Sequence, residues 1–147
     1  MAKVVWAMPT WLFLHTLVAK ISEDKYPLIQ QELLYQVKNI CAVLPCPDCA
    51  HHATQYLAGV QLKHVPTKEA FKVVLWRFHN TVNARTGKPV FPLEKMAIYD
   101  RCNLNVMYNV FITEFSKSSH NPKLMMDVMA REAVLTKFKK WMTTLNL

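Results

Sequence analysis

The stretch LPCPDCAHHATQYL, residues 44–57, separates two helical segments and so decides how the chain is divided. Pro45 ends the apolar segment before it, because proline lacks the N–H group that a helix interior needs. Cys46 and Cys49 follow with two residues between them, at the predicted start of a helix over about residues 46–57. The cysteine pair therefore stands at a helix N-terminus, where the free N–H groups and the helix dipole stabilise a thiolate.

Two chemistries suit this cysteine pair equally when it is considered alone. A Cys-x-x-Cys pair opens and closes as a disulfide, and the same spacing forms half of a zinc site. His51 and His52 follow directly and are candidate further zinc ligands. The other two cysteines, Cys41 and Cys102, have no spacing that completes a ferredoxin-type cluster. Redox chemistry and metal binding both remain open at this point.

The composition favours one helical domain. The chain has 147 residues, of which 52% are hydrophobic, and it holds only 2 glycines, too few for the tight turns of an all-β fold. The formal net charge is +8, but no run of five or more basic residues occurs. We interpret this charge as a solvated basic surface, with a nucleic-acid or partner-binding adaptor as an alternative.

The N-terminal segment predicts neither a secretory signal nor a membrane span. His15 interrupts its apolar run, Pro9 comes early, and no small-residue cleavage site follows. We therefore expect a protein without a membrane span, located in the cytoplasm. Four cysteines in such a chain favour metal or redox chemistry over a structural disulfide framework.

The hydrophobic periodicity predicts an all-α fold without strands. Thr10 is a predicted cap for the first helix, and the segment SKSSHNP (residues 116–122) is a predicted polar linker before the last helix. Without βαβ units, a thioredoxin-like explanation of the cysteine pair fails. The predicted helices cover about residues 10–21, 27–43, 46–57, 67–85, 93–115 and 122–145.

A second group of chemically unusual residues lies on the fourth predicted helix. Trp76, His79, Asn80 and Asn83 share one stripe at i, i+3, i+4 and i+7. Buried amides and imidazoles need hydrogen-bond partners, which a bound heterocycle with a phosphate would provide. Lys88 follows a glycine and is placed to reach such a phosphate. The alternative is a solvated polar face with one half-buried tryptophan.

Three stretches together resemble the Erv/ALR family of FAD-linked sulfhydryl oxidases. They are TWLFLHT, with Trp11 and His15 one helical turn apart, then LPCPDCAHH, then FHNTVNARTGKPVF. They occur in the family's order and with similar spacing over about residues 6–92. The compact motifs look most like the short enzymes of large cytoplasmic DNA viruses.

This resemblance implies a four-helix bundle with an additional short helix cradling FAD, as residues 1–116, and a C-terminal helical extension over residues 117–147. It implies an enzyme, usually a homodimer, that oxidises protein thiols and passes electrons through FAD to oxygen, giving hydrogen peroxide. Cys46 and Cys49 are then catalytic, with Cys46 meeting the substrate and Cys49 facing the flavin. The residues expected to line FAD are Trp11, His15, Cys49, His52, Trp76, His79, Asn80, Val82, Asn83 and Lys88.

The resemblance also sets expectations for partners and location. It implies protein thiol substrates, a small thiol-disulfide shuttle protein among them, and no metal or nucleic acid. If the chain is viral, we expect a late protein of the host cytoplasm, with the virion as a further location. The alternative is a zinc module built on Cys46, Cys49 and His51 or His52. One departure concerns Trp76, which stands where many relatives carry a structural cysteine, and Cys41 and Cys102 are then expected to be isolated apolar thiols.

Overall fold

The chain folds entirely into helices over the part that a computed structural model describes, residues 5–117 and 125–147. No strand occurs in those two ranges, so the predicted all-α class is confirmed. None of the helices in them is both long enough and apolar enough to cross a membrane. The elements in chain order are α1 (Ala7–Lys20), α2 (Tyr26–Ala42), α3 (Pro47–Ala58), the 3-10 helix η1 (Leu62–His64), α4 (Lys68–Arg85), the 3-10 helix η2 (Leu93–Arg101), α5 (Leu104–Lys117) and α6 (Met125–Thr144).

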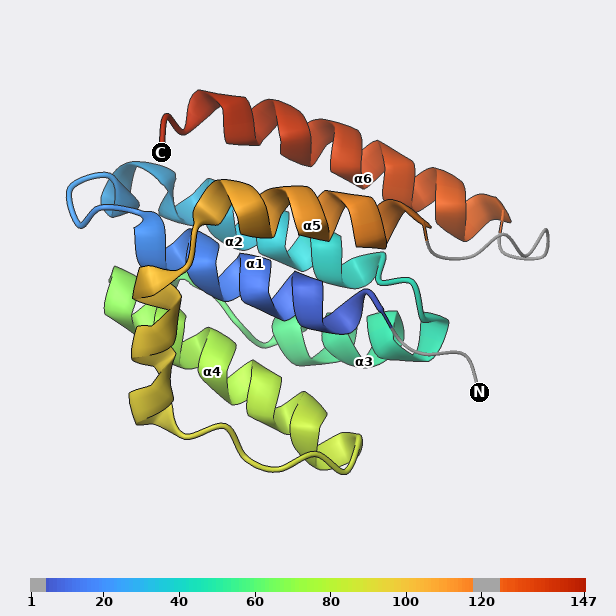
Figure 1. Ribbon diagram of the computed structural model, residues 1–147, viewed down its shortest axis with the longest axis horizontal. Coiled ribbons are helices and arrows are strands. Elements are labelled where there is room, and N and C mark those ends of the chain that lie inside the picture. Colours follow the sequence, from blue (N-terminus) through green and yellow to red (C-terminus); the bar gives the residue numbers. More distant parts are fainter. Residues whose placement is uncertain (1–4, 118–124) are drawn as a thin grey trace.

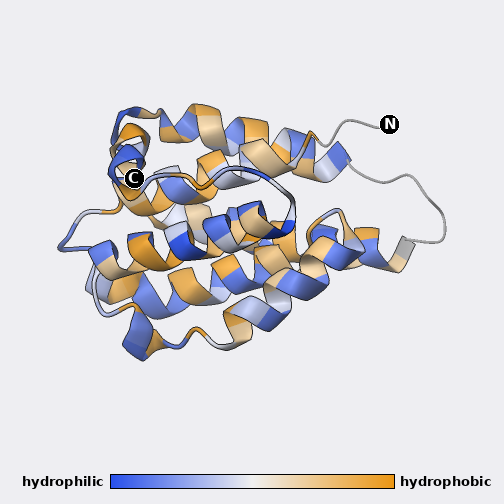
Figure 2. Cartoon of the chain, turned by 90° about the horizontal axis from the view of Figure 1, so that it is seen from below, coloured by the Kyte–Doolittle hydropathy of each residue, from blue (hydrophilic) through white to orange (hydrophobic). Residues whose placement is uncertain are grey.

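Helix α1 runs through the middle of the fold, between α5 on one side and α4 with η2 on the other (Figure 1). Every residue from Phe13 to Ala19 is buried, which is more than one face of a helix. A helix that is covered on all sides can be apolar on every face, and the sequence of α1 is mostly apolar. Hydrophilic and hydrophobic residues alternate along the helices of the fold (Figure 2).

Helix α6 shares its core with the helices that precede it. It packs against α2 and α5 (Figure 1). Phe138 has no exposed surface and meets the ring of Phe13 edge-on, with ring centroids 5.7 Å apart. The predicted division of the chain at residue 116 stays a prediction. The predicted linker beyond residue 117 and the predicted helix start at Pro122 lie outside the described residues.

The predicted cap of the first helix was wrong. Helix α1 begins at Ala7, so Thr10 lies inside it, and its hydroxyl donates to the carbonyl of Trp6 at 2.6 Å. Pro9 is tolerated at the third helical position, because the first N–H groups of a helix have no intrahelical acceptor. The helix consequently starts one turn earlier than Thr10 alone suggests.

The predicted single helix over residues 93–115 was also wrong. The chain forms the 3-10 helix η2, becomes extended at Cys102, and starts again as α5. The side chain of Asn103 accepts a hydrogen bond from the N–H of Val106 at 3.0 Å, which is how an N-cap begins a helix. This break gives η2 a direction of its own, and it buries Met96 and Tyr99 beside α1.

Replacing Phe138 with alanine should lower the free energy of unfolding by about 3–5 kcal/mol, because a fully buried ring leaves a cavity between three helices. The matched control is Lys137→Ala on the exposed side of α6, which should change it by less than about 0.5 kcal/mol. Urea titration followed by circular dichroism measures both. If Phe138→Ala produced an early transition of α6 alone, α6 would not share the core of the fold.

Candidate active site

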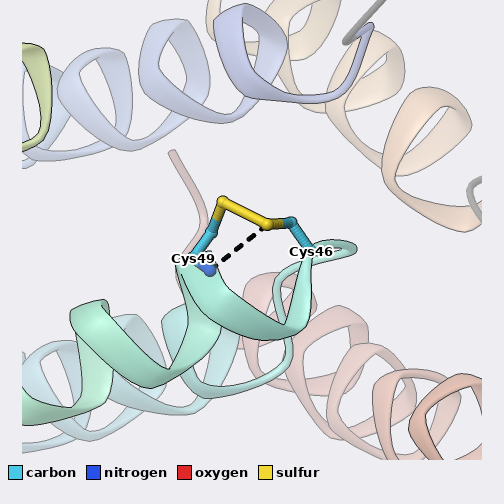
Figure 3. The surroundings of a disulfide bond; sticks show 2 residues. All are labelled: Cys46 and Cys49. Atoms are coloured by element: carbon cyan, nitrogen blue, oxygen red, sulfur yellow. Dashed lines mark hydrogen bonds between the residues drawn. A yellow bond between two sulfur atoms is a disulfide. The ribbon is translucent and has the colours of Figure 1, made fainter. Parts of the chain in front are cut away.

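The cysteine pair forms a disulfide on the first turn of α3. The Cα atoms of Cys46 and Cys49 are 5.1 Å apart, and both residues are half-buried. Cys46 is the extended N-cap of the helix, Pro47 occupies the first helical position, and the N–H of Cys49 donates to the sulfur of Cys46 at 3.2 Å. Figure 3 shows both sulfurs raised above this turn of the helix. The predicted placement at a helix N-terminus is therefore observed.

A cavity of about 600 Å³ lies against this disulfide, between α1, α3 and α4. Its volume is in the range of sites that hold drug-sized or cofactor-sized molecules. Both cysteines line it, and so do five other residues expected at the cofactor: Trp11, His79, Val82, Asn83 and Lys88. Further lining residues were not predicted from the sequence, namely Trp6, Met8, Leu44, Arg85, Phe91 and Tyr99 among others.

Stacked rings form one wall of this cavity. The rings of Trp11 and His79 are nearly parallel, with centroids 4.0 Å apart. Behind them, Nε2 of His15 lies 3.0 Å from Nδ1 of His79, so one ring donates a hydrogen bond to the other. His15 also stacks against the ring of Tyr99 in η2, with ring centroids 4.6 Å apart. The wall is therefore tied together across α1, α4 and η2.

His79 in this wall and His15 behind it are both neutral at physiological pH. Burial, and then the neighbouring His79, lower the pKa of His15 from 6.5 to about 3. Burial, and then the charge of Lys88, lower the pKa of His79 to about 4. The second ring nitrogen of His15, Nδ1, is buried and has no hydrogen-bond partner within the described part of the protein. A positive charge on either ring would be poorly solvated, so the wall presents flat, uncharged rings.

The loop after α4 is fastened to that helix by side-chain hydrogen bonds. Asn80 accepts from the N–H of Phe91 at 2.8 Å and donates to its carbonyl at 3.0 Å. Trp76 donates its indole N–H to the same carbonyl at 2.7 Å. Asn83 in turn donates to Asn80 at 3.2 Å. The polar partner expected for this stripe is thus the protein's own loop, at least for Trp76 and Asn80.

The same loop places Lys88 at the cavity. Its N–H donates to the carbonyl of Asn83 at 2.8 Å. The preceding Gly87 has a φ of 75°, a left-handed conformation that glycine adopts without the strain that a Cβ brings. The Gly-Lys pair in the sequence therefore corresponds to a turn that brings the lysine back toward α4.

Four of the predicted cofactor residues do not line the cavity. His15 lies behind the ring wall, and Trp76 and Asn80 hold the loop. His52 is exposed on α3, beside the exposed His51. Residues 5–117 and 125–147 contain no group of three or more His, Cys, Asp or Glu side chains arranged for a metal ion. Cys41 is free and lines the cavity, and Cys102 is free and half-buried.

The chain belongs to the Erv1/Alr family, whose sequence model matches residues 8–101. Over 94 residues it is 31% identical to protein 347L of Invertebrate iridescent virus 6, provisionally described as a FAD-linked sulfhydryl oxidase, and this match covers 60% of the chain and 85% of the relative. A FAD-linked sulfhydryl oxidase of African swine fever virus is 30% identical over 103 residues, which cover 69% of the chain and 86% of the relative. The Arabidopsis thaliana FAD-linked sulfhydryl oxidase ERV1 is 38% identical over 91 residues, which cover 59% of the chain and 45% of the relative. No solved structure matches the chain.

The neutral histidines make the stability of the fold depend on pH. In the unfolded chain an imidazole takes a proton near pH 6.5, whereas His15 and His79 resist protonation down to about pH 3 and about pH 4. Their contribution is complete above pH 6.5 and is lost progressively below it, because the unfolded chain then binds more protons. Replacing His15 with glutamine should flatten this acid dependence in urea titrations at pH 7 and pH 5. An acid slope unchanged by His15→Gln would contradict the prediction.

The hold of Asn80 on the loop can be measured at one amide. The Asn80→Ala variant leaves the N–H of Phe91 without its acceptor, so that this amide should exchange with deuterium about tenfold faster or more. The control is Thr81→Ala at the next, exposed position, whose hydroxyl donates to the carbonyl of Arg77 in the same helix. Exchange of Phe91 that is equal in both variants would show that Asn80 does not secure the loop.

Proposed function

We propose that this protein is a FAD-dependent sulfhydryl oxidase that forms disulfide bonds in protein substrates. The observation that carries the proposal is a Cys-x-x-Cys disulfide in the wall of a large, ring-lined cavity. Membership of the Erv1/Alr family and the names of its relatives support the same activity. A disulfide that touches both a cofactor-sized cavity and the surface has the position needed to pass electrons inward.

The residues of the cavity fit a dinucleotide with a flat heterocycle and a pyrophosphate. Trp11 and His79 offer parallel rings for stacking, and the neutral state of His79 keeps that wall apolar. Arg85 and Lys88 line the same cavity and supply positive charge for phosphate oxygens. Asn83 and Val82 would complete the contact on α4. When bound, FAD would supply an acceptor for the two electrons of the cysteine pair, with oxygen as the final acceptor and hydrogen peroxide as its product.

The chemistry of the cysteines follows from thiol-disulfide exchange. A substrate thiolate attacks the sulfur of Cys46, forms a bond to it, breaks the bond to Cys49 and releases Cys49 as a thiolate. A second substrate thiolate attacks the substrate sulfur, so the substrate leaves as a disulfide and Cys46 leaves as a thiolate. Two electrons pass to the cysteine pair, and two protons go to solvent. The N-cap position of Cys46 favours the second step, because its sulfur already accepts the N–H of Cys49.

The four expected residues that do not line the cavity would support the site or lie at its edge. His15 would fix the orientation and neutral state of His79 from behind, and Trp76 and Asn80 would hold the loop that carries Lys88. His52 would approach the cofactor from the exposed side of α3. We also propose a homodimer that acts in the cytoplasm on protein thiols, directly or through a small shuttle protein, with oxygen as the final acceptor.

The Cys46→Ser variant separates cofactor binding from catalysis. The purified wild-type protein should be yellow with a flavin absorption band, and Cys46→Ser should keep the band because most of the cavity wall is unchanged. Its oxidation of dithiothreitol should fall by more than about a hundredfold, because no disulfide remains to exchange. Oxygen consumption measures this rate. Cys102→Ser is the matched control and should keep both colour and rate, since Cys102 is a free thiol that does not line the cavity.

Two outcomes would contradict the proposal. A colourless wild-type protein that stays colourless after incubation with FAD would show that the cavity does not bind FAD. A yellow Cys46→Ser variant with undiminished turnover would show that another group receives the substrate thiolate.

A further inference from the structure

A second, smaller pocket lies against the turn that carries the disulfide. It has a volume of about 300 Å³ and is formed by the end of α2, the outer face of α3 and the first turns of α6. We call it the α6 pocket. Its lining residues are Ala42, Val43, Leu44, Pro47, Ala50, His51, Thr54, Asp127 and Ala130.

The α6 pocket and the large cavity lie on either side of one short segment. Leu44 lines both of them. Two residues later, Cys46 lines the large cavity, and the next residue, Pro47, lines the α6 pocket. If a cofactor fills the large cavity, a substrate must reach the disulfide from outside it. The α6 pocket is a recess that begins within one residue of Cys46.

Helix α6 is fixed in the position that forms this pocket. The guanidinium of Arg131 is buried, and its Nε donates to the carbonyl of Val43 at 3.0 Å, which ties α6 to the turn before the disulfide. Asp127 and Ala130, which wall the pocket, lie within one turn of that contact. Helix α6 lies beyond residues 8–101, the part matched by the family model. This wall is therefore a contribution of the chain's own C-terminal helix.

We propose that the α6 pocket binds an apolar side chain next to the reacting cysteine of an extended protein substrate. This inference rests on the proposed oxidase function and specifies its substrate. A disulfide holds its two Cα atoms about 4.4–6.8 Å apart, so a substrate cysteine bonded to Cys46 lies close to Pro47. An extended chain advances about 3.3 Å per residue, so the substrate residues one or two positions away reach the pocket.

The lining of the α6 pocket indicates the kind of side chain it accepts. Ala42, Val43, Leu44, Pro47 and Ala50 supply the apolar part of its lining, whereas His51, Thr54 and Asp127 supply polar atoms. The pocket is large enough for one branched aliphatic or aromatic side chain, and burial of that side chain provides affinity that a small thiol lacks. The exchange step itself is unchanged: the substrate dithiol loses two electrons and the Cys46–Cys49 disulfide gains them.

Two pairs of variants of the full-length, FAD-loaded protein test the inference, one pair on α6 and one pair on α3. Each pair consists of a pocket variant and a control variant. Ala130→Trp on α6 and Thr54→Trp on α3 place a bulky ring at exposed positions that line the pocket. Ala133→Trp and Gln55→Trp place the same ring at exposed positions on the same helices that do not line it. Because all four sites are exposed, a loss of folding in one pair leaves the other pair to decide.

The substrates are dithiothreitol and two synthetic dithiol peptides that differ only in having leucine or glycine beside the first cysteine. The wild type should oxidise the leucine peptide with about tenfold higher kcat/KM than the glycine peptide, since partial burial of leucine is sufficient for this ratio. Ala130→Trp and Thr54→Trp should abolish that preference while oxidising dithiothreitol within about twofold of wild type. Ala133→Trp and Gln55→Trp should keep the preference.

The outcomes distinguish the two proposals. Failure of the wild type to oxidise dithiothreitol would overturn the oxidase function, and the docking inference with it. Oxidation of dithiothreitol with no preference for leucine, or with a preference that survives both pocket variants, would overturn the docking inference alone. A change in the mass of the particle in solution for Ala130→Trp, with peptide oxidation unchanged, would identify the α6 pocket as a contact between copies of this chain and would also overturn it.

Discussion

The fold depends on the burial of the middle of α1, from Phe13 to Ala19, on all sides. A helix that is covered by α5, α4 and η2 at once sets the positions of those three elements relative to one another. Trp11 and His15 lie on this helix, so the ring wall of the cavity is placed by the same packing that holds the core. The hydrogen bond between His15 and His79 then joins α1 to α4 at the cavity itself. Stability and site geometry therefore have one common origin.

Periodicity and composition were sufficient to predict the helical class and the order of the helices, because both depend on which faces are apolar. They failed where one hydrogen bond decides a boundary. Asn103 caps a new helix inside what reads as one continuous segment, and Thr10 bonds back to Trp6 instead of capping. An asparagine followed by an apolar run was a signal for the first of these.

The candidate site was predicted in part. Cys46, Cys49, Trp11, His79 and Asn83 converge on one cavity, although they come from three helices far apart in the sequence. The partners of Trp76 and Asn80 could not be predicted, because the backbone of Phe91 that they bind is brought to them by the loop and not by helical spacing. The contribution of Phe91 and Tyr99 to the site was missed for the same reason. Which of these residues touch a cofactor remains a prediction.

The position of Leu44 has a consequence for how such a protein can change over evolutionary time. Leu44 lines both the large cavity and the α6 pocket. A substitution of Leu44 alters the volume of the large cavity and of the α6 pocket together. Selection therefore cannot change the volume of one pocket through this residue without changing the other. Ala130, by contrast, lines the α6 pocket and not the large cavity. Diversification of the α6 pocket is therefore expected to proceed through the residues that line it alone, on α3 and α6 and at the end of α2, while Leu44 stays fixed.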